Sequence, residues 1–273
     1  TIHDYMDSEE FLEEVSSGLF EQPVTAILHQ GACTDTMQND GRYMMANNYT
    51  FSKYLLRFAM ENQVPLVYAS SGATYGAQRS FEEIPENERP INVYGYSKLA
   101  FDQHVRSVMA DAESTIVGLR YFNVYGPRET QKGRMASMVY QLYRQLKKDG
   151  VCKLFEGTDG YGDGEQRRDF VSVDDVVKVN LHFAATRNVK GIVNVGTGHA
   201  RSFNDVANAI IAVLGLGSIQ YIPFPDSLVG KYQSFTQADL SSLRKLGYEG
   251  DFADLEEGVK RAIAGYEEFD RFA

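Results

Sequence analysis

Cysteine is scarce in this chain, which has 273 residues and only two cysteines, Cys33 and Cys152. So few cysteines predict no disulfide framework and fit a reducing compartment. The five histidines are scattered along the sequence, without the spacing that metal ligands require, so we expect no metal site. Packing explains Cys33 better than a nucleophilic role does.

Positive charge is also in deficit, because 37 acidic residues outnumber 27 basic ones and give a net charge of −10. Nucleic-acid binding depends on basic patches, so this balance argues against a nucleic-acid partner. A few local arginines or a helix N-terminus can still bind an anionic nucleotide. No apolar run approaches the length of a membrane span, and the first residues lack a signal-peptide pattern. We therefore expect a cytoplasmic protein without a membrane partner.

Apolar runs alternate with stretches of helical periodicity along the chain. We expect strands over 24–32, 64–71, 115–122 and 191–195, and helices over 41–61, 93–112, 134–148 and 202–214. This alternation predicts βαβ units, and hence an α/β fold with a doubly wound parallel sheet and helices on both faces. The acidic, glycine-rich stretch 157–166 follows no clear strand, and we expect it to be a mobile loop beside the substrate site.

Tyr94 and Lys98 lie four residues apart at the start of a predicted helix. Residues at i and i+4 share one helical face, so we expect the lysine ammonium to lie within a few ångströms of the phenol. A cation at ~4 Å favours the phenolate by about 4 kcal/mol at an effective dielectric of about 20, or roughly three pKa units. Such a shift would bring Tyr94 towards the range of an effective general base. Tyr96 is only two residues from Lys98 and is the poorer candidate.

Context separates this pair from chance matches, of which 17 tyrosines should give roughly one. Two other tyrosine–lysine pairs have the same spacing: Tyr49 with Lys53, and Tyr143 with Lys147. Both lie in amphipathic helical stretches with nothing catalytic nearby. The strand at 64–71, by contrast, ends in hydroxyl residues and a glycine turn. Ligands bind beyond the carboxyl ends of strands in an open α/β sheet, so Ser71 and Tyr94 would form a hydroxyl pair that holds a substrate oxygen.

Several segments together carry a family resemblance. The first three are Ser-Ser-x-x-x-Tyr-Gly at 70–76 followed by Tyr-x-x-x-Lys, Arg-Asp-Phe-Val-x-Val-Asp-Asp at 168–175, and Asn-x-Gly-Thr-Gly at 194–198. Over essentially the whole chain, they resemble the extended short-chain dehydrogenases, the NAD(P)-dependent sugar-nucleotide epimerases and dehydratases. The runs 120–129, 132–137, 153–157 and 232–240 resemble the branch of this family that epimerises a heptose nucleotide.

The resemblance implies an epimerase that inverts C6 of an ADP-heptose for lipopolysaccharide inner-core synthesis. Inversion proceeds by transient oxidation with bound NADP, with NAD as the second possibility. Tyr94 and Lys132 are implied as two bases that serve the two epimers. Lys98 would lower the pKa of Tyr94 and hold the nicotinamide ribose, and Ser71 would hold the reacting oxygen. A homo-oligomer, specifically a pentamer, is also implied.

The remaining candidate residues form two sets. The cofactor set is Gln30, Gly31, Ala32, Cys33, Thr34, Asn47 and Val124, together with Tyr94, Lys98 and Lys132. The substrate set is Ser71, Asn123, Arg134, Gln141, Phe155, Glu156, Gly157, Thr158, Arg168 and Tyr232.

Most of these residues also have ordinary explanations. Without the resemblance, residues 30–34 fit a plain strand-to-helix turn as well as they fit a cofactor contact. On that view Asn123 is an asparagine in a turn, Lys132 is a lysine exposed to solvent, and Tyr232 is an aromatic residue at the rim of the site. Arg168 can pair either with the neighbouring Asp169 or with a diphosphate.

We expect residues 1–125 with parts of 165–200 to form an NADP-binding Rossmann domain, and residues 126–164 and 200–273 to form a smaller substrate-binding lobe. The glycine-rich turn that binds a dinucleotide is absent from the sequence. The chain opens at a point that resembles the end of the family's third strand. A strand–helix–strand unit takes about 30 residues or more, so we expect that residues precede Thr1.

Two alternatives stay open. A different sugar-nucleotide enzyme on the same scaffold, such as a 4-epimerase or a 4,6-dehydratase, would share Ser71, Tyr94 and Lys98. A dehydratase usually has an Asp-Glu pair after the serines, where this chain has Gly72 and Ala73. A non-catalytic homologue is favoured only if the glycine-rich turn is truly lost.

Overall fold

The computed structural model describes residues 2, 4–229 and 232–269. Thr1 and His3 of the predicted opening segment, and residues 230–231 and 270–273 of the predicted substrate lobe, lie outside this part. Within the described ranges, none of the helices is both long enough and apolar enough to cross a bilayer.

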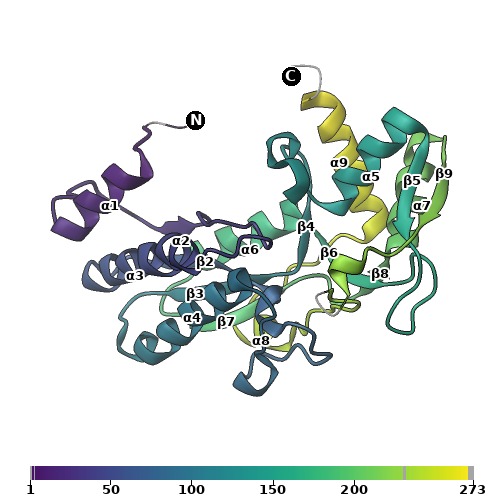
Figure 1. Ribbon diagram of the computed structural model, residues 1–273. Coiled ribbons are helices and arrows are strands. Elements are labelled where there is room, and N and C mark those ends of the chain that lie inside the picture. The colour runs from purple at the N-terminus through teal and green to yellow at the C-terminus, as the bar shows by residue number, and fades with distance from the viewer. Residues whose placement is uncertain (1, 3, 230–231, 270–273) are drawn as a thin grey trace.

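A four-stranded parallel sheet forms the centre of the fold, in the order β1 (Ile27–His29), β2 (Leu66–Ser71), β3 (Ile116–Tyr121) and β7 (Lys190–Val195) (Figure 1). All four predicted strands are present, although β1 is much shorter than the predicted 24–32. The register pairs Ser71 with Tyr121, and Tyr121 with Val195. The carboxyl ends of three strands therefore lie along one edge, where ligands bind in such sheets.

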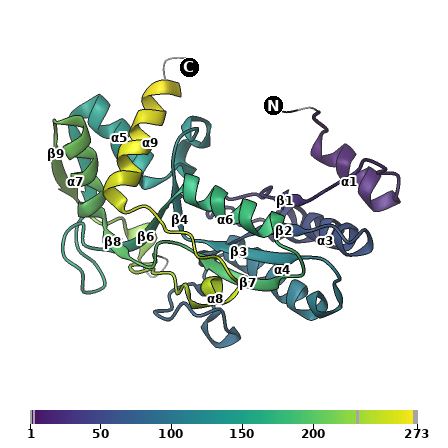
Figure 2. The same ribbon diagram turned by 180° about the vertical axis from the view of Figure 1, so that it is seen from behind.

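Helices cover both faces of this sheet, which confirms the predicted doubly wound fold. One face carries α3 (Phe51–Glu61) and α4 (Val93–Val108), and the other carries α6 (Val173–Ala185) and α8 (Ser241–Lys245) (Figures 1 and 2). Strand residues alternate between the two layers, as the pleat of a strand requires. On β2, Leu66 and Tyr68 join the core under α3 and α4, whereas Val67 joins the core under α6.

A second group of elements lies beyond the carboxyl edge of this sheet and has its own core. The helices α5 (Met138–Asp149), α7 (Phe203–Leu214) and α9 (Leu255–Phe269) pack together with β5 (Val151–Phe155), as Figure 1 shows. The strand β5 pairs in parallel with β9 (Ser218–Ile222). Between the two groups, β6 (Arg167–Ser172) pairs with β4 (Asn123–Tyr125) and with β8 (Ala200–Ser202).

The remaining elements are short. They are α1 (Ser8–Ser17), α2 (Gly41–Met45), a π-helical turn at Ala46–Thr50, and 3₁₀ turns at Gly72–Tyr75, Pro85–Asn87, Met109–Asp111, Thr130–Met135 and Asp226–Leu228. The predicted helix over 41–61 is confirmed, but it contains the π-helical turn in its middle.

Side-chain caps fix where the helices near the carboxyl edge begin. Asn92 is the N-cap of α4: its side chain accepts a hydrogen bond from the Gly95 N–H at 2.8 Å, and the helix begins at Val93, one residue before Tyr94. Ser137 caps α5 by accepting from the Tyr140 N–H. A capping box between Ser202 and Asp205 starts α7.

One prediction about the loop at 157–166 is wrong. This loop directly follows β5, which ends at Phe155. The strand escaped detection because it is short and carries a single strongly polar residue, Lys153, between the buried Cys152 and Leu154.

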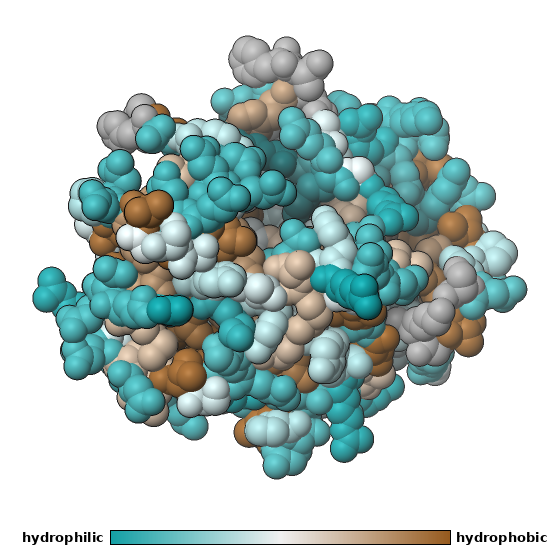
Figure 3. All heavy atoms as spheres, turned by 60° about the vertical axis from the view of Figure 1, so that its left-hand side comes forward, coloured by the Kyte–Doolittle hydropathy of each residue, from teal (hydrophilic) through white to brown (hydrophobic). Residues whose placement is uncertain are grey.

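The molecular surface in Figure 3 is mostly hydrophilic, with hydrophobic residues scattered among polar ones. That mixture is ordinary for a folded protein, because isolated apolar side chains are common on surfaces. The surface colouring therefore does not by itself mark a functional site.

Gly118 on β3 offers a test of the central packing. A Cβ at this position would lie 2.4 Å from the Cζ and hydroxyl oxygen of Tyr68, whose hydroxyl is held by Asp102 at 2.9 Å. We expect Gly118→Ala to lower the free energy of unfolding by about 1–3 kcal/mol, measured by urea denaturation. Gly41→Ala is the control, because nothing lies within 4 Å of a Cβ there and alanine favours the helix. Equal stability of the two variants would contradict this packing.

Candidate active site

The hydroxyl pair predicted from the sequence is formed at the carboxyl edge of the sheet. Ser71 ends β2, and its side chain is hydrogen-bonded to the phenol of Tyr94 at the start of α4. Its hydroxyl oxygen also accepts from the Ala73 N–H at 3.1 Å. The adjacent Ser70 points the other way and donates to Asp102 at 2.8 Å. Ser71 is therefore the serine that is available to a ligand.

Lys98 does not act on Tyr94 as predicted. The lysine is buried, and its Nζ donates to the Ala69 carbonyl of β2 at 2.9 Å. Burial raises the pKa of Tyr94 above its ordinary value, and the hydrogen bond with Ser71 only partly opposes this rise. The expected lowering of the Tyr94 pKa is thus wrong for this structure, because loss of hydration outweighs any favourable charge.

The same burial changes Lys98 itself. Desolvation lowers the pKa of Lys98 to about 8, although the nearby Asp102 carboxylate opposes the shift. An ammonium has three N–H donors, and one of them is used at Ala69. The remaining donors make Lys98 chemically suited to hold hydroxyl groups of a bound ligand.

The predicted cofactor turn at 30–34 follows β1 and is held by side chains from two sides. The Gln30 amide donates to Asn180 Oδ1 at 3.0 Å, and its oxygen accepts from the Tyr121 hydroxyl at 3.0 Å. The N–H and carbonyl of Cys33 bond to the side chain of Asn48 at 2.8 and 2.9 Å. The turn has a fixed backbone, and Gly31 and Thr34 are exposed on it.

Asn47 and Asn48 take opposite positions although they are neighbours. Asn47 is exposed, and its side chain donates to the Tyr43 carbonyl of its own helix at 2.8 Å. Asn48 is 1% exposed and contacts the turn. The sequence prediction placed Asn47 at the cofactor; in the structure it is Asn48 that contacts the predicted cofactor turn, through the backbone of Cys33.

Lys132 and Arg134 lie in the 3₁₀ turn Thr130–Met135, and both are exposed. A buried carboxylate organises this segment: Glu129 accepts from the Gly126 N–H, the Ser137 N–H and hydroxyl, and the Tyr266 hydroxyl.

One ion pair brings this turn next to the predicted cofactor turn, and a second contact supports the turn from within its own segment. Arg134 forms an ion pair with Asp35 at 2.5 Å, next to the cofactor turn. The predicted substrate residue Gln141 donates to the Ala136 carbonyl at 2.7 Å and so supports the same segment. The structure thus brings the Lys132 segment beside residues 30–35.

Arg168 lies buried against aromatic rings and does not pair with Asp169. Its guanidinium carbon lies 4.7 Å from the ring centroid of Tyr232 and 5.7 Å from that of Phe203. Successive residues of a strand point to opposite faces, so the Asp169 carboxylate instead accepts backbone N–H bonds from Thr197, Gly198 and Ala238.

The environment of Arg168 favours an anionic ligand. In the described ranges 4–229 and 232–269, no carboxylate forms a salt bridge with this guanidinium. Burial lowers the pKa of Arg168, and the adjacent Tyr232 only partly opposes this. A buried cation without a counter-charge is costly, and a phosphate would supply that charge through bidentate hydrogen bonds.

The other predicted substrate residues surround this arginine or lie at the strand ends. Phe155 packs edge-on against Phe224 at 5.5 Å, and Phe224 packs against Tyr232 at 5.4 Å. Glu156, Gly157 and Thr158 continue from β5 into the loop at 157–166, with the Gly157 N–H bound to Asp163. Asn123 is exposed on β4, next to Val124.

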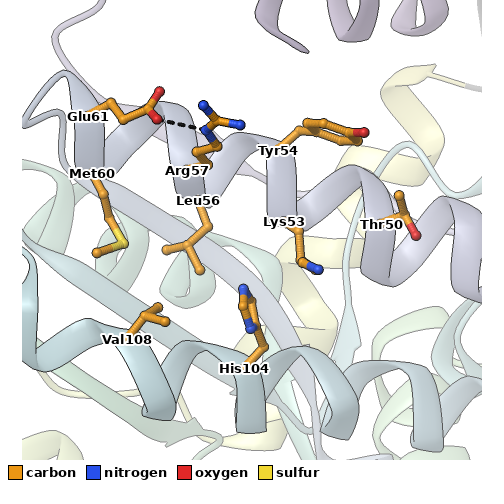
Figure 4. A pocket seen from close by; sticks show the side chains of 9 residues that line it. All are labelled: Thr50, Lys53, Tyr54, Leu56, Arg57, Met60, Glu61, His104 and Val108. Atoms are coloured by element: carbon orange, nitrogen blue, oxygen red, sulfur yellow. Dashed lines mark hydrogen bonds and ion pairs between the residues drawn. The ribbon is translucent and has the colours of Figure 1, made fainter.

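Within the part of the chain that the structure describes, no group of three or more histidine, cysteine, aspartate or glutamate side chains is placed to bind a metal ion. A groove of about 560 Å³ lies elsewhere, between α3 and α4 (Figure 4). There Lys53 Nζ lies 5.2 Å from the ring centroid of Tyr49, over the ring face. Neither Ser71 nor Tyr94 is among the residues that line the groove, so it is separate from that pair.

Four residues that shape the site were not predicted from the sequence: Asn48, Glu129, Asn180 and Phe224. Each supports a predicted residue through side-chain contacts between segments distant in sequence. Glu129 had a weak signal, because it follows the Gly-Pro-Arg turn, whereas the others had none.

His29, at the end of β1, offers a pH test of this buried region. Burial, with a smaller contribution from Lys98, lowers the pKa of His29 from 6.5 to about 4. Between these values the unfolded chain binds more protons, so stability is fully present above pH 6.5 and falls as the pH drops towards 4. From about pH 7 to about pH 4.5, the wild type should lose about 2–3 kcal/mol more than His29→Gln, measured by urea unfolding. Parallel pH profiles of the two proteins would show that His29 is not buried as a neutral group.

Comparison with known proteins agrees with this geometry. The family model for the NAD dependent epimerase/dehydratase family matches residues 6–196. An ADP-L-glycero-D-manno-heptose-6-epimerase of Alkalilimnicola ehrlichii is 52% identical over 262 residues, which cover 96% of this chain and 82% of that protein.

Two solved structures are also similar. The ADP-L-glycero-D-manno-heptose-6-epimerase of Helicobacter pylori has a TM-score of 0.81 and 35% identity, covering 95% of this chain and 77% of that one. The UDP-glucose 4-epimerase of Thermus thermophilus, in complex with NAD, has a TM-score of 0.77 and 26% identity, covering 96% and 83%. The chain therefore belongs to the NAD dependent epimerase/dehydratase family.

Proposed function

We propose that this protein is an epimerase that inverts C6 of ADP-D-glycero-D-manno-heptose to give ADP-L-glycero-D-manno-heptose. The observation that carries this proposal is the hydrogen-bonded Ser71–Tyr94 pair at the carboxyl edge of the sheet, beside the buried Lys98. The choice of a heptose over another sugar is supported by the 52% identity to an enzyme named for that reaction. A 4-epimerase or 4,6-dehydratase on the same scaffold is less well supported.

The residues present fit a nicotinamide dinucleotide. Lys98 has N–H donors beyond the one bound at Ala69, and the turn at 30–34 presents Gly31 and Thr34 on a fixed backbone. When bound, such a cofactor accepts a hydride from the sugar carbon and returns it. We propose that residues 30–34, Asn47, Val124 and Lys132 contribute to its site, and that NADP is preferred over NAD.

The protein's own residues would move the protons. The phenol oxygen of Tyr94 exchanges a proton with the sugar oxygen, and the Ser71 hydroxyl holds the sugar oxygen by a hydrogen bond. The raised pKa of Tyr94 favours the neutral phenol, which suits the step that donates a proton to the sugar. Lys132 comes from a different element, so we propose that it serves the other epimer.

Arg168 and Tyr232 are proposed to bind the diphosphate end of the substrate. The argument is the buried guanidinium with aromatic neighbours instead of a carboxylate. Asn123, Arg134, Gln141 and residues 155–158 would complete the substrate site.

The broader setting is also a proposal. We infer a cytoplasmic homo-oligomer, a pentamer by family resemblance, that supplies lipopolysaccharide inner-core synthesis. Residues 1–125 with parts of 165–200 would bind the cofactor, and residues 126–164 and 200–273 would bind the sugar nucleotide.

Replacing Tyr94 tests the central assignment. We expect Tyr94→Phe to lower kcat by about 10²–10⁴-fold, because the proton-transferring oxygen is lost. The measurement is conversion of ADP-D-glycero-D-manno-heptose, followed by separation of the two epimers. Tyr49→Phe is the matched control, since Tyr49 has a lysine at the same spacing but lies beside the α3–α4 groove, and it should retain activity. Near-normal turnover by a folded Tyr94→Phe protein would remove Tyr94 from the mechanism.

Lys132 separates a two-base epimerase from enzymes that use a single tyrosine. If Lys132 serves one epimer, Lys132→Met should cut kcat by about 10²-fold or more at saturating substrate. Stability should not change, because the side chain is exposed. Steady-state kinetics that show only a raised KM would reduce Lys132 to a binding residue and would favour a generic sugar-nucleotide epimerase.

A further inference from the structure

The loop at 157–166 leads from β5 into β6, and hydrogen bonds hold its base in place. The Gly164 N–H donates to the Phe155 carbonyl at 2.9 Å, which closes the loop on the end of β5. The side chain of Asn204, on α7, donates to the Asp163 carbonyl at 2.8 Å. The base of the loop is therefore tied to both a strand and a helix of the second group of elements.

The tip of this loop is a tight turn whose sequence suits its backbone. The Tyr161 N–H donates to the Thr158 carbonyl at 3.0 Å. The two central residues, Asp159 and Gly160, have φ values of 55° and 82°. This hydrogen bond and two positive φ angles match a type I′ turn, for which Asp-Gly is a preferred sequence. A defined backbone thus presents the side chains of Asp159 and Tyr161.

Both of these side chains contact segments that are distant in the sequence. The Asp159 carboxylate accepts a hydrogen bond from the Ser234 hydroxyl. The Tyr161 phenol oxygen accepts from Arg79 Nη1 at 3.4 Å. Arg79 belongs to the stretch that follows β2 and its Ser71 end. The tip of the loop therefore connects the second group of elements with the group that contains the central sheet.

Tyr161 also lies near the buried guanidinium of Arg168. Burial lowers the pKa of Arg168, and the charges that oppose this shift come from Tyr232 and Tyr161. The contact between Arg79 and Tyr161 gives this proximity a geometric counterpart on the other side of the phenol. Tyr161 thus stands between two arginines that come from different parts of the chain.

The donors of these three side chains are largely unused. The Tyr161 oxygen accepts from Arg79, so its own hydrogen is left to donate. Arg168 donates to the Arg167 carbonyl at 2.9 Å, and each guanidinium has more N–H groups than these contacts use. In the ranges 4–229 and 232–269, neither arginine forms a salt bridge with a carboxylate. Two guanidiniums and a phenol suit an anion with several oxygens, such as a diphosphate.

We propose that Tyr161 and Arg79 are further binding residues for the diphosphate of the sugar nucleotide, and that they act together with Arg168. Tyr161 donates its hydroxyl hydrogen to a phosphate oxygen, and Arg79 adds a second positive charge from the opposite segment. The proposal rests on the proposed function for the identity of the ligand. Neither residue belongs to the substrate set predicted from the sequence.

The affinity of the 273-residue protein for ADP tests this proposal, because ADP carries the diphosphate without the heptose. Isothermal titration calorimetry gives the Kd. ADP can also bind at the cofactor turn, so Arg168→Gln first identifies the ADP that is bound at this site. We expect Tyr161→Phe and Arg79→Gln each to raise the Kd of that ADP about tenfold or more, as loss of a hydrogen bond to a charged group typically does.

Arg187→Gln is the matched control. Arg187 is an exposed arginine, so its replacement changes the net charge by the same amount as Arg79→Gln. It lies near Thr115, at the amino end of β3 and hence at the opposite edge of the sheet. The Kd for ADP should stay at the wild-type value in this variant.

The salt dependence of the Kd separates direct contact from a supporting role. Arg79→Gln should weaken this dependence, because one cation fewer faces the phosphates. Tyr161→Phe should keep the wild-type dependence, because it removes no charge. A variant whose loop is merely loosened would bind ADP less tightly without a change in the salt dependence.

Several results would overturn the proposal. An unchanged Kd in Tyr161→Phe and Arg79→Gln refutes it, and so does an unchanged Kd in Arg168→Gln, because no ADP is then bound at this site. A wild-type salt dependence in Arg79→Gln reduces Arg79 to a structural contact. If the variants lose ADP affinity as expected but the wild type does not epimerise the heptose, the binding residues stand and the proposed function fails.

Discussion

The site depends on a buried network of charges around Arg120. This arginine is fully buried on β3, and its guanidinium binds two carboxylates, Asp102 of α4 and Glu88 of the loop before it. Asp102 also accepts from Tyr68 and Ser70 on β2. The network therefore fixes α4 against two strands, and α4 carries Tyr94 and Lys98. Breaking one partner of a buried ion pair typically costs about 3–5 kcal/mol, so this arrangement tolerates little change.

Glu88 shows how the network compensates for burial. Burial by itself raises the pKa of Glu88, but hydrogen bonds from Arg106 and the charge of Arg120 lower it below its ordinary value. The carboxylate stays ionised because two guanidinium groups face it. Other buried carboxylates bind backbone N–H groups instead. Glu129 accepts hydrogen bonds from the backbone on both sides of the turn that contains Lys132, and Asp169 accepts them from residues 197, 198 and 238. Part of the acidic excess of the chain is thus used to fix loops around the site.

Periodicity predicted the four strands of the central sheet and the helices α3 and α4 on one face, because burial alternates in strands and repeats every 3.6 residues in helices. The helices α6 and α8 on the other face were not predicted. Periodicity could not predict how polar side chains connect distant segments. The strand expected over 24–32 spans only three residues, and Gln30 and Cys33 after it bond to the side chains of Asn180, Tyr121 and Asn48 instead. Asn47 and Asn48 are identical in type, so the sequence contained no indication that Asn48 is buried and Asn47 exposed.

The Tyr94–Lys98 spacing shows the same limit at the site itself. The spacing correctly predicted that both residues lie on one helix, α4, but it gave no information on what packs against them. The Lys98 ammonium donates a hydrogen bond to the Ala69 carbonyl, and burial raises the pKa of Tyr94. A pKa depends on hydration and partners in three dimensions, which a helical repeat does not contain.

The buried cations divide into two kinds, and the division explains how an acidic protein can select an anionic ligand. Arg120 is neutralised by two carboxylates and is structural. Lys98 bonds to a backbone carbonyl, and Arg168 stacks on aromatic rings and bonds to the Arg167 carbonyl. Neither forms a salt bridge in the described part of the chain. Each retains N–H donors in a buried region of low dielectric, although the Asp102 carboxylate partly offsets the charge of Lys98. Because a net charge of −10 repels anions over the surface, binding of an anionic ligand would depend on such local N–H donors.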